Sequence, residues 1–314
     1  MNWQPSATIN ALRKRAEMLC IIRNFLTSRG CFEVETPLMA QFGVTDVYLT
    51  PIKALCNGAQ YCLQTSPEYH MKRLLAAGSG PIFQIGKAFR DDELGRWHNP
   101  EFTMLEWYQP GYSHHDLLEE VDALLQLILG CPALIKKTYK QAFQEVCGLN
   151  PFTASIFDFK TVLLQVGLDN VLDKDELDRD QYLFLLMSHI IEPHFADALA
   201  PLAIYNFPPS QAALAQIKAG EAERFEVYFK GVELANGFHE LTEPQIQYER
   251  FQQDIAVRVE KGLPEAYPDT YLIEALHAGI PACSGVALGV DRLIALALGY
   301  SSIQQVQAFD VSRA

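Results

Sequence analysis

The chain has 314 residues, 49% of them hydrophobic, and a formal net charge of −13. This length allows one large hydrophobic core or two smaller ones, and no run of about 18 apolar residues indicates a membrane span. The excess of acidic residues disfavours a broad phosphate-binding face. The first residues lack the order of a secretory signal, and seven cysteines without a Cys-x-x-Cys pair indicate reduced thiols. We therefore expect a cytoplasmic protein.

The N-terminal segment predicts a helix followed by a strand. Apolar residues recur at steps of three and four, which predicts one buried helix face. These residues are Ile9, Leu12, Ala16, Leu19, Ile22 and Leu26. Gly30 suits the end of the helix. Phe32, Val34 and Thr36 then alternate with other residues up to Pro37, which predicts a short strand.

A second helix is predicted after Thr65. The run Ser66-Pro67-Glu68 precedes it, and Pro67 suits a first helical turn. Met71, Leu74 and Leu75 then form its buried side.

The segment 87–103 predicts the charged loop of a β-hairpin. Apolar runs at 81–85 and 104–108 flank it and predict the two strands. Arg90 leaves the first strand, and its planar, permanently charged group suits phosphate and carboxylate oxygens. A solvated hairpin tip is the alternative interpretation of the loop.

Two strands are predicted around Lys230-Gly231. Glu226, Glu233 and Glu240 lie among apolar neighbours there, where an isolated charge is costly to desolvate. Such acids need a cation, a hydrogen-bond network or a metal, and hard carboxylate oxygens suit Mg²⁺. Structural salt bridges are the alternative.

The middle of the chain is less informative. Ser113 and Asp116 predict a helix start before an apolar stripe that ends near residue 128. The acidic run 169–180 predicts a solvated helix cap and turn, with a docking face for a basic partner as the alternative.

The segment 283–298 predicts a glycine-rich strand that enters a helix. Gly285 and Gly289 carry no side chain and allow close backbone approach. Arg292 lies at the helix start, within reach of a phosphate. Tight packing alone is the alternative.

The helix and strand ending at Pro37, the string Phe-Arg followed by Arg-x-His-Asn-Pro-Glu-Phe-Thr, and the glycine-rich strand with its Asp-Arg pair occur in this order. They resemble motifs 1, 2 and 3 of the class II aminoacyl-tRNA synthetases in their lysyl form, over about residues 8–310. The resemblance implies an α/β catalytic domain with a mainly antiparallel sheet flanked by helices. It implies a single domain over 1–314 with a helical insertion at about 113–220, and a homodimer formed through motif 1.

The resemblance also assigns site residues. Arg90 and Arg292 are the expected catalytic residues, and Glu226 and Glu233 the expected Mg²⁺ ligands. The expected ATP-binding residues are Arg90, Asp91, Asp92, Asn99, Phe102, Glu233, Leu234, Gly289 and Arg292. The expected substrate-binding residues are Ser66, Pro67, Glu68, Tyr108, Asn236, Glu240 and Ala287. Two separate acids, Glu68 and Glu240, fit a ligand with two ammonium groups. Asp92 departs from the family pattern, which usually has glutamate.

Only a few residues precede the motif 1 helix, so we expect no anticodon-binding domain and an acceptor other than tRNA. The resemblance is closest to stand-alone lysyl-tRNA synthetase-like ligases that join (R)-β-lysine to a lysine of elongation factor P. Ala287 replaces a family glycine, and its methyl group disfavours α-lysine by ~1–3 kcal/mol if it clashes. The alternatives are a compact synthetase that charges tRNA, a non-catalytic synthetase-like regulator, and a ligase for a small metabolite.

Overall fold

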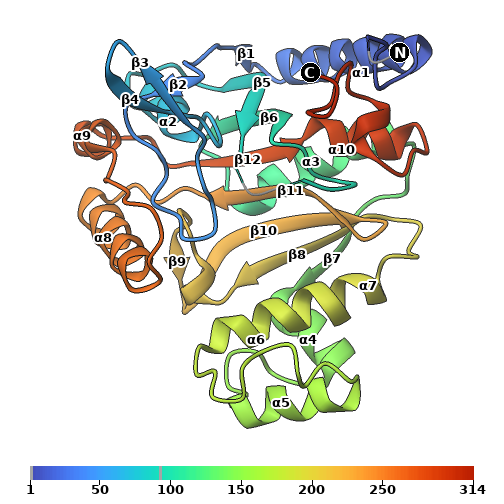
Figure 1. Ribbon diagram of the computed structural model, residues 1–314, viewed down its shortest axis with the longest axis vertical. Coiled ribbons are helices and arrows are strands. Elements are labelled where there is room, and N and C mark those ends of the chain that lie inside the picture. Colours follow the sequence, from blue (N-terminus) through green and yellow to red (C-terminus); the bar gives the residue numbers. More distant parts are fainter. Residues whose placement is uncertain (1–2, 92–93) are drawn as a thin grey trace. The chain divides into compact units, whose positions relative to one another are not determined.

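The computed structural model describes residues 3–91 and 94–314 (Figure 1). The chain divides into two compact units, Met1–Gly130 with His239–Ala314 and Cys131–Phe238. The chain therefore leaves the first unit once and returns to it. The helix expected near the start of the insertion, α3 (His114–Leu129), belongs to the first unit, and the second unit extends beyond residue 220.

The first unit contains four sheet strands in the order β1 (Phe32–Glu33), β5 (Ile82–Phe89), β6 (Glu101–Pro110) and β12 (Cys283–Gly289). β1 pairs with β5 in parallel, whereas the β5–β6 and β6–β12 pairs are antiparallel. Residues 103–109 of β6 are all buried, as in a strand covered on both faces. A smaller sheet has the order β2 (Met39–Ala40), β4 (Ala59–Leu63) and β3 (Lys53–Cys56).

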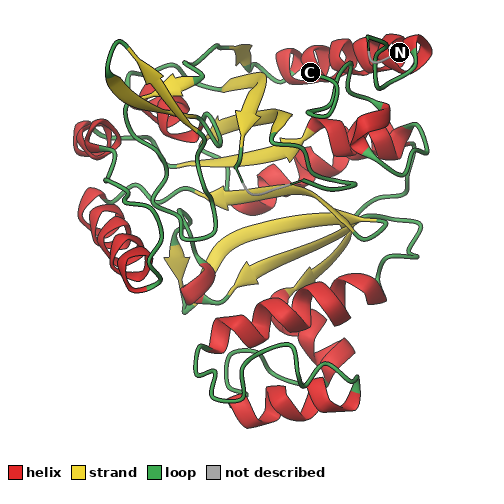
Figure 2. Ribbon diagram, in the orientation of Figure 1, coloured by secondary structure: helices red, strands yellow, loops and turns green. Residues whose placement is uncertain are grey.

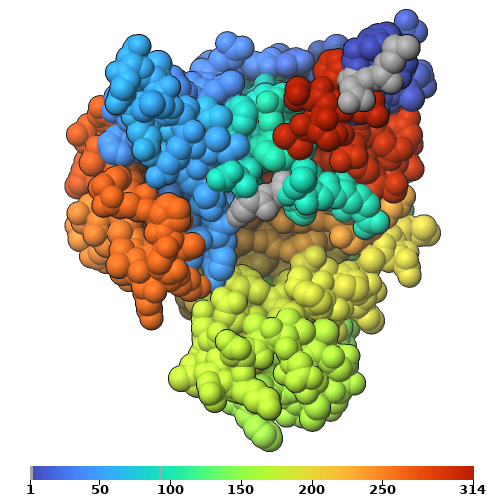
Figure 3. All heavy atoms as spheres, in the orientation of Figure 1, coloured from blue at the N-terminus to red at the C-terminus, as the bar shows by residue number. Residues whose placement is uncertain are grey.

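Helices of the first unit are drawn red in Figure 2. Besides α3, they are α1 (Ile9–Ser28), α2 (Glu68–Ala76), α8 (Pro244–Glu260), α9 (Thr270–Ala278), α10 (Val290–Ala297) and the short 3-10 helix Ile303–Gln305. Ser113 and Asp116 form a capping box at the start of α3, as predicted. Ser6 N donates to Ala308 O at 2.8 Å, and Figure 3 shows the dark-blue N-terminal segment next to the red C-terminal segment.

The prediction for the buried face of α1 was only partly correct. The buried residues are Ala11, Ile22, Phe25 and Leu26, whereas Ile9 is 58% exposed. The apolar stripe of this helix is broader than the face that the unit covers. Part of the stripe is therefore left on the surface.

The second unit contains β7 (Ile135–Thr138), β8 (Leu202–Phe207), β10 (Glu221–Phe229) and β11 (Val232–His239) in this order, with β9 (Ile217–Lys218) paired to β10. Its helices are α4 (Tyr139–Cys147), α5 (Ile156–Gln165), α6 (Arg179–Leu186), the π-helix Met187–Ile191, α7 (Glu192–His194) and the 3-10 helix Pro209–Gln211. Buried aromatic residues such as Tyr139, Phe143 and Phe159 form its core. Within the described part of the chain, no helix is long and apolar enough to cross a membrane.

Candidate functional site

The predicted motif 2 hairpin is confirmed. β5 and β6 pair from Ile82↔Tyr108 to Phe89↔Glu101, and residues 90–100 connect them. Arg90 N donates to Pro100 O at 3.0 Å, and the Arg90 guanidinium lies 5.1 Å from the centroid of the Phe102 ring. A permanent cation therefore lies beside an aromatic ring at the base of the loop.

The other expected ATP-binding residues of the loop, Asp91 and Asn99, have contacts of their own with other parts of the chain. Asp91 N donates to Thr50 O at 3.0 Å, and its side chain is exposed. Asp92 lies outside the described residues. Asn99 is buried: its Nδ2 donates to Glu101 O at 2.6 Å, and its Oδ1 accepts from Val311 N at 3.1 Å. The amide of Asn99 thus holds the loop itself, and these two bonds use one of its two N–H donors and one of the two lone pairs of its oxygen.

The predicted strand and helix of motif 3 are confirmed as β12 and α10. Gly289 is the last residue of the strand and the N-cap of the helix. Arg292 follows one turn later. Its Nε donates to Trp97 O at 3.1 Å, and its Nη2 lies 2.6 Å from His98 Nε2. The motif 3 arginine therefore contacts the loop that begins with Arg90.

A cluster of buried acids lies between α2, β6 and the residue that follows β11. Glu106 is 2% exposed and Glu240 is 1% exposed. Ser66 Oγ and Tyr108 OH each donate to one carboxylate oxygen of Glu106 at 2.6 Å. Glu68 begins α2 directly after Pro67, and its backbone N donates to Ser66 Oγ at 3.1 Å. The expected substrate-binding residues Ser66, Glu68, Tyr108 and Glu240 thus meet around Glu106, and we call this group with Lys72 the amine pocket.

Lys72 is the cation of the amine pocket. It lies one turn after Glu68 on α2, and its side chain is 2% exposed. Lys72 Nζ lies 2.7 Å from Glu68 Oε1 and 2.5 Å from Glu240 Oε2. An ammonium group therefore already bridges the two acids that were expected to bind substrate amines.

Burial controls the protonation of these acids. Desolvation, assisted by the charges of Glu68 and Glu240, raises the pKa of Glu106 to about 8. Desolvation also raises the pKa of Glu240 to about 7, although the neighbouring Lys72 ammonium acts in the opposite direction. A further ammonium in the pocket favours the ionised form of both acids.

β12 forms one wall of the amine pocket. Gly285 pairs with Tyr108, and Ala287 pairs with Glu106. A Cβ at Gly285 would lie 2.2 Å from Tyr108 Cε1 and 2.6 Å from Glu240 Oε1, so only glycine fits there. Directly opposed residues of an antiparallel pair project to the same side, which puts the Ala287 methyl group beside Glu106.

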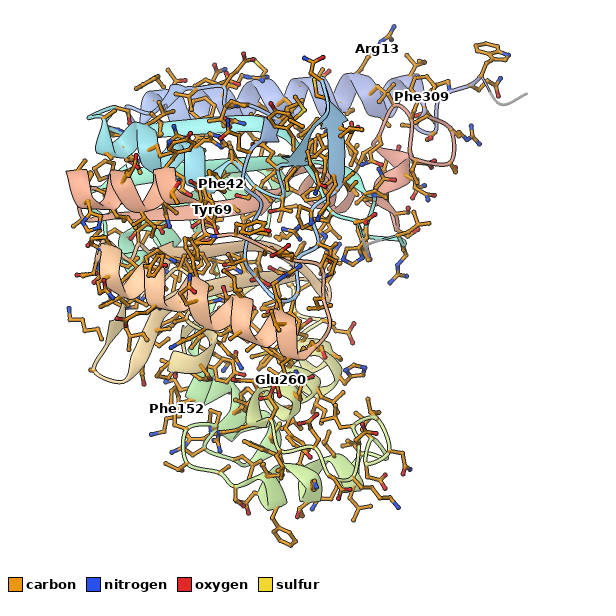
Figure 4. The ribbon with its side chains drawn as sticks, turned by 60° about the vertical axis from the view of Figure 1, so that its left-hand side comes forward. Arg13, Phe42, Tyr69, Phe152, Glu260 and Phe309 are labelled. Atoms are coloured by element: carbon orange, nitrogen blue, oxygen red, sulfur yellow. The ribbon has the colours of Figure 1, made fainter. Side chains whose placement is uncertain are left out.

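The amine pocket adjoins a hollow beside α2. Ser66 and Glu68 line this hollow together with Phe42 and Tyr69, and Figure 4 labels the latter two. Tyr69 is fixed on α2 and packs against Phe251, with 5.8 Å between ring centroids. The hollow is therefore bordered by Ser66 and Glu68, two residues of the amine pocket.

The second unit carries the two expected metal ligands on one face of the β10–β11 hairpin, which turns at Lys230 and Gly231 as predicted. Glu226 pairs with Asn236, and Tyr228 pairs with Glu233. The register shifts between these two pairs, which leaves Leu234 as the extra residue of a β-bulge. Because of the bulge, Glu233 and Asn236 project to the same face despite their odd spacing.

Glu226 already forms an ion pair with Arg224, as in the salt-bridge interpretation, and Glu192 adds a third acid near Glu226 and Glu233. Glu226 accepts hydrogen bonds from Arg224 and Tyr228. Burial, and then the charges of Glu226 and Glu233, raise the pKa of Glu192 on α7 to about 8. Leu234 is 2% exposed, so its side chain belongs to the core and only its backbone is available for a nucleotide.

The two carboxylates suit Mg²⁺ that arrives with a nucleotide. Mg²⁺ commonly takes one or two carboxylates together with substrate phosphates. Across residues 3–91 and 94–314, no group of three or more His, Cys, Asp or Glu side chains is arranged to hold a metal ion. Phosphate oxygens and water would therefore complete the coordination.

The sequence analysis missed three charged residues, Glu106, Lys72 and Glu192. Glu106 lies in the apolar run 104–108, and the desolvation argument applied to Glu226 applies equally to it. Lys72 follows Glu68 by four residues on a predicted helix, which signals an ion pair. We find no sequence signal for Glu192.

The arginine-bearing hairpin, the glycine-rich strand that enters a helix and the mostly antiparallel sheet flanked by helices define a class of enzyme that activates a carboxylate with a nucleotide. The sequence model of the family described as tRNA synthetases class II (D, K and N) matches residues 1–313, and the chain belongs to this family. Its fold is the class II synthetase fold, as predicted. Enzymes of this family are ATP-dependent ligases that activate an amino acid by adenylation, and they use ATP and Mg²⁺.

Proposed function

We propose that the protein activates (R)-β-lysine with ATP and transfers it to the ε-amino group of a lysine on elongation factor P. The observation that carries this proposal is the meeting of Glu68, Glu106 and Glu240 in one pocket. Three acids and one lysine leave an excess of carboxylates, which disfavours the side-chain carboxylate of aspartate and finds no positive charge on the neutral amide of asparagine. Among the amino acids of the matched family, the amine pocket therefore favours a substrate with two ammonium groups.

Ala287 supports a β-amino rather than an α-amino substrate. Its methyl group lies beside Glu106 on the pocket face of β12. A methyl group at a pocket wall discriminates between close analogues by about 10–200-fold. Moving the amine from the α to the β carbon shifts its charge by about one bond length, and a methyl group at the pocket wall can discriminate over that distance.

In the activation step, Arg90 binds the α-phosphate and the amino-acid carboxylate together. A carboxylate oxygen attacks the α-phosphorus, the bond to the β-phosphate oxygen breaks, and pyrophosphate leaves. Phe102 stacks on the adenine, and Arg292 binds the γ-phosphate. Glu226 and Glu233 would hold Mg²⁺, which would supply positive charge to phosphate oxygens.

In the transfer step, the neutral ε-amine of the acceptor lysine attacks the acyl carbon of the adenylate. A C–N bond forms, the C–O bond to phosphate breaks, AMP leaves with the electron pair, and the nitrogen loses its proton. The enzyme needs no covalent nucleophile. The net charge of −13 provides no general attraction for a polyanionic tRNA, which supports a protein acceptor.

The test has two stages. ATP–pyrophosphate exchange is measured with (R)-β-lysine, α-lysine, aspartate and asparagine, and we expect the highest kcat/KM with (R)-β-lysine. The labelled amino acid is then offered with elongation factor P or with total tRNA. We expect label on elongation factor P, and none after its amines have been methylated. Label on tRNA alone would overturn the proposed acceptor.

A further inference from the structure

Lys72 has two carboxylate partners from different parts of the chain. Glu68 lies one turn before it on α2, and Glu240 follows the last residue of β11. Each of these acids is within 2.7 Å of Lys72 Nζ, and the lysine side chain is 2% exposed. This ion pair therefore ties α2 to the segment that carries Glu240.

The exposed pair Lys14–Glu17 shows the contrast. Its atoms are 2.9 Å apart, but its side chains are 50% and 60% exposed. Solvent screens such a pair, so it contributes little to structure or binding. The ion pairs of Lys72 are shielded from water, and charges interact more strongly in the protein interior than in water.

The amine pocket contains more carboxylates than ammonium groups. Three carboxylates, from Glu68, Glu106 and Glu240, act on one another there, and Lys72 contributes the ammonium that contacts two of them. With all three acids ionised, one ammonium leaves two negative charges. A diamino acid contributes two ammonium groups.

We propose that Lys72 is a positioning residue of the amine pocket: its ammonium holds Glu68 and Glu240 in place and balances one of three carboxylates, leaving two charges for a diamino acid. This inference rests on the proposed function. Loss of Lys72 leaves Glu68 and Glu240 without the ammonium that holds them, and it favours protonation of these buried acids. Amino-acid binding suffers, whereas Arg90 and Phe102 remain as they are.

The first experiment replaces the charge and keeps the length of the side chain. For Lys72→Met, we expect the KM for the diamino acid in ATP–pyrophosphate exchange to rise roughly tenfold or more. The KM for ATP stays within about twofold, because the nucleotide contacts are elsewhere. Lys14→Met is the matched control, and its KM values stay at those of the unchanged enzyme. A wild-type KM for the diamino acid in Lys72→Met overturns the proposal.

The second experiment separates charge from packing. Lys72→Ala leaves a space that a small amine can enter, so ethylammonium should lower the KM for the diamino acid several-fold. Tetramethylammonium at the same concentration is the control, because it has no N–H to donate to the carboxylates. Equal effects of the two salts count against a specific ammonium site.

Folding is checked by thermal unfolding of each variant. If neither Lys72→Met nor Lys72→Ala folds, Lys72 is a folding residue and the proposal is overturned. Failure of the proposed function is seen separately, because it appears in the unchanged enzyme as absence of exchange with any diamino acid. If the unchanged enzyme shows exchange and the Lys72 variants keep its KM for the diamino acid, only the proposed role of Lys72 is refuted.

Discussion

Arg15 Nη1 lies 2.6 Å from Asp291 Oδ1, and this ion pair joins α1 to the helix that carries Arg292. Arg15 Nη2 also donates to Thr103 Oγ1 at 2.8 Å. Asp291 Oδ2 accepts from Thr103 N at 2.8 Å. One arginine of the first helix thus fixes the residues next to Phe102 and Arg292, two of the expected ATP contacts.

Arg15→Gln should destabilise the protein and weaken ATP use. Asp291 is 2% exposed, and removal of its cation leaves a buried charge that costs about 3 kcal/mol. We expect the free energy of unfolding in urea to fall by this amount and the KM for ATP to rise. Lys14 is the exposed neighbour of Arg15, and Lys14→Gln should change the free energy of unfolding by less than about 0.5 kcal/mol. An equal loss in both variants would contradict the interpretation.

Arg90→Ala should nearly abolish activation without unfolding the protein. The arginine stabilises charge on the transferred phosphoryl group, and removal of one such contact typically costs about 10²–10³ in kcat. ATP–pyrophosphate exchange measures this loss, and the thermal unfolding midpoint checks the fold. Near wild-type exchange by a folded variant would show that Arg90 does not act in activation.

Ala287→Gly should move substrate preference toward α-lysine. The methyl group beside Glu106 is lost, while the ion pairs of Lys72 are unchanged. We expect the ratio of kcat/KM for (R)-β-lysine to that for α-lysine to fall by about 10–200-fold. The KM for ATP serves as the control and should stay constant. An unchanged ratio means that Ala287 only packs against its neighbours.

The pKa of Glu106 predicts opposite pH dependences for stability and binding. Burial raises this pKa from 4.5 to about 8, so the folded state binds the proton more tightly than the unfolded chain. The contribution of Glu106 to stability therefore decreases as pH rises from about 4.5 to 8. A diamino acid needs the ionised carboxylate, so its KM should fall over the upper part of this range.

Urea unfolding and exchange assays at several pH values test both trends. In Glu106→Gln, the free energy of unfolding should fall less between about pH 4.5 and 8, because the titrating group is gone. Glu17→Gln on the surface of α1 is the control and should follow the unchanged protein. Identical pH profiles for Glu106→Gln and the unchanged protein would exclude a raised pKa.

We predict a homodimer formed through the motif 1 segment. Ile9, Ile21, Phe32 and Met39 are 58%, 40%, 50% and 41% exposed, so apolar surface remains uncovered on α1 and the strands after it. Light scattering at micromolar concentration should give twice the chain mass. Phe32→Glu should produce monomers, whereas Phe157→Glu, a control on the second unit, should leave the dimer intact.

The sequence determined the elements and the order of the motifs. α2 begins beside Pro67, the β5–β6 hairpin flanks the charged loop, and the Lys230-Gly231 turn joins β10 and β11, all as predicted. These features depend on local preferences: proline suits a first helical turn, and alternating or short apolar runs suit strands. Such signals can be read within a few residues of the position that they describe.

Tertiary structure decided which charges meet. Glu68, Glu106 and Glu240 are distant in sequence, and they come together because β12 pairs with β6 and the Glu240 backbone N donates to Cys283 O at 3.0 Å. A shift of one residue in strand register would turn a side chain such as Glu106 to the opposite face. Packing places Lys72 between two acids. Packing also leaves Ile9 exposed, although the helix was predicted to bury it. Helical spacing shows that a helix has an apolar face, but only packing determines how much of that face is covered.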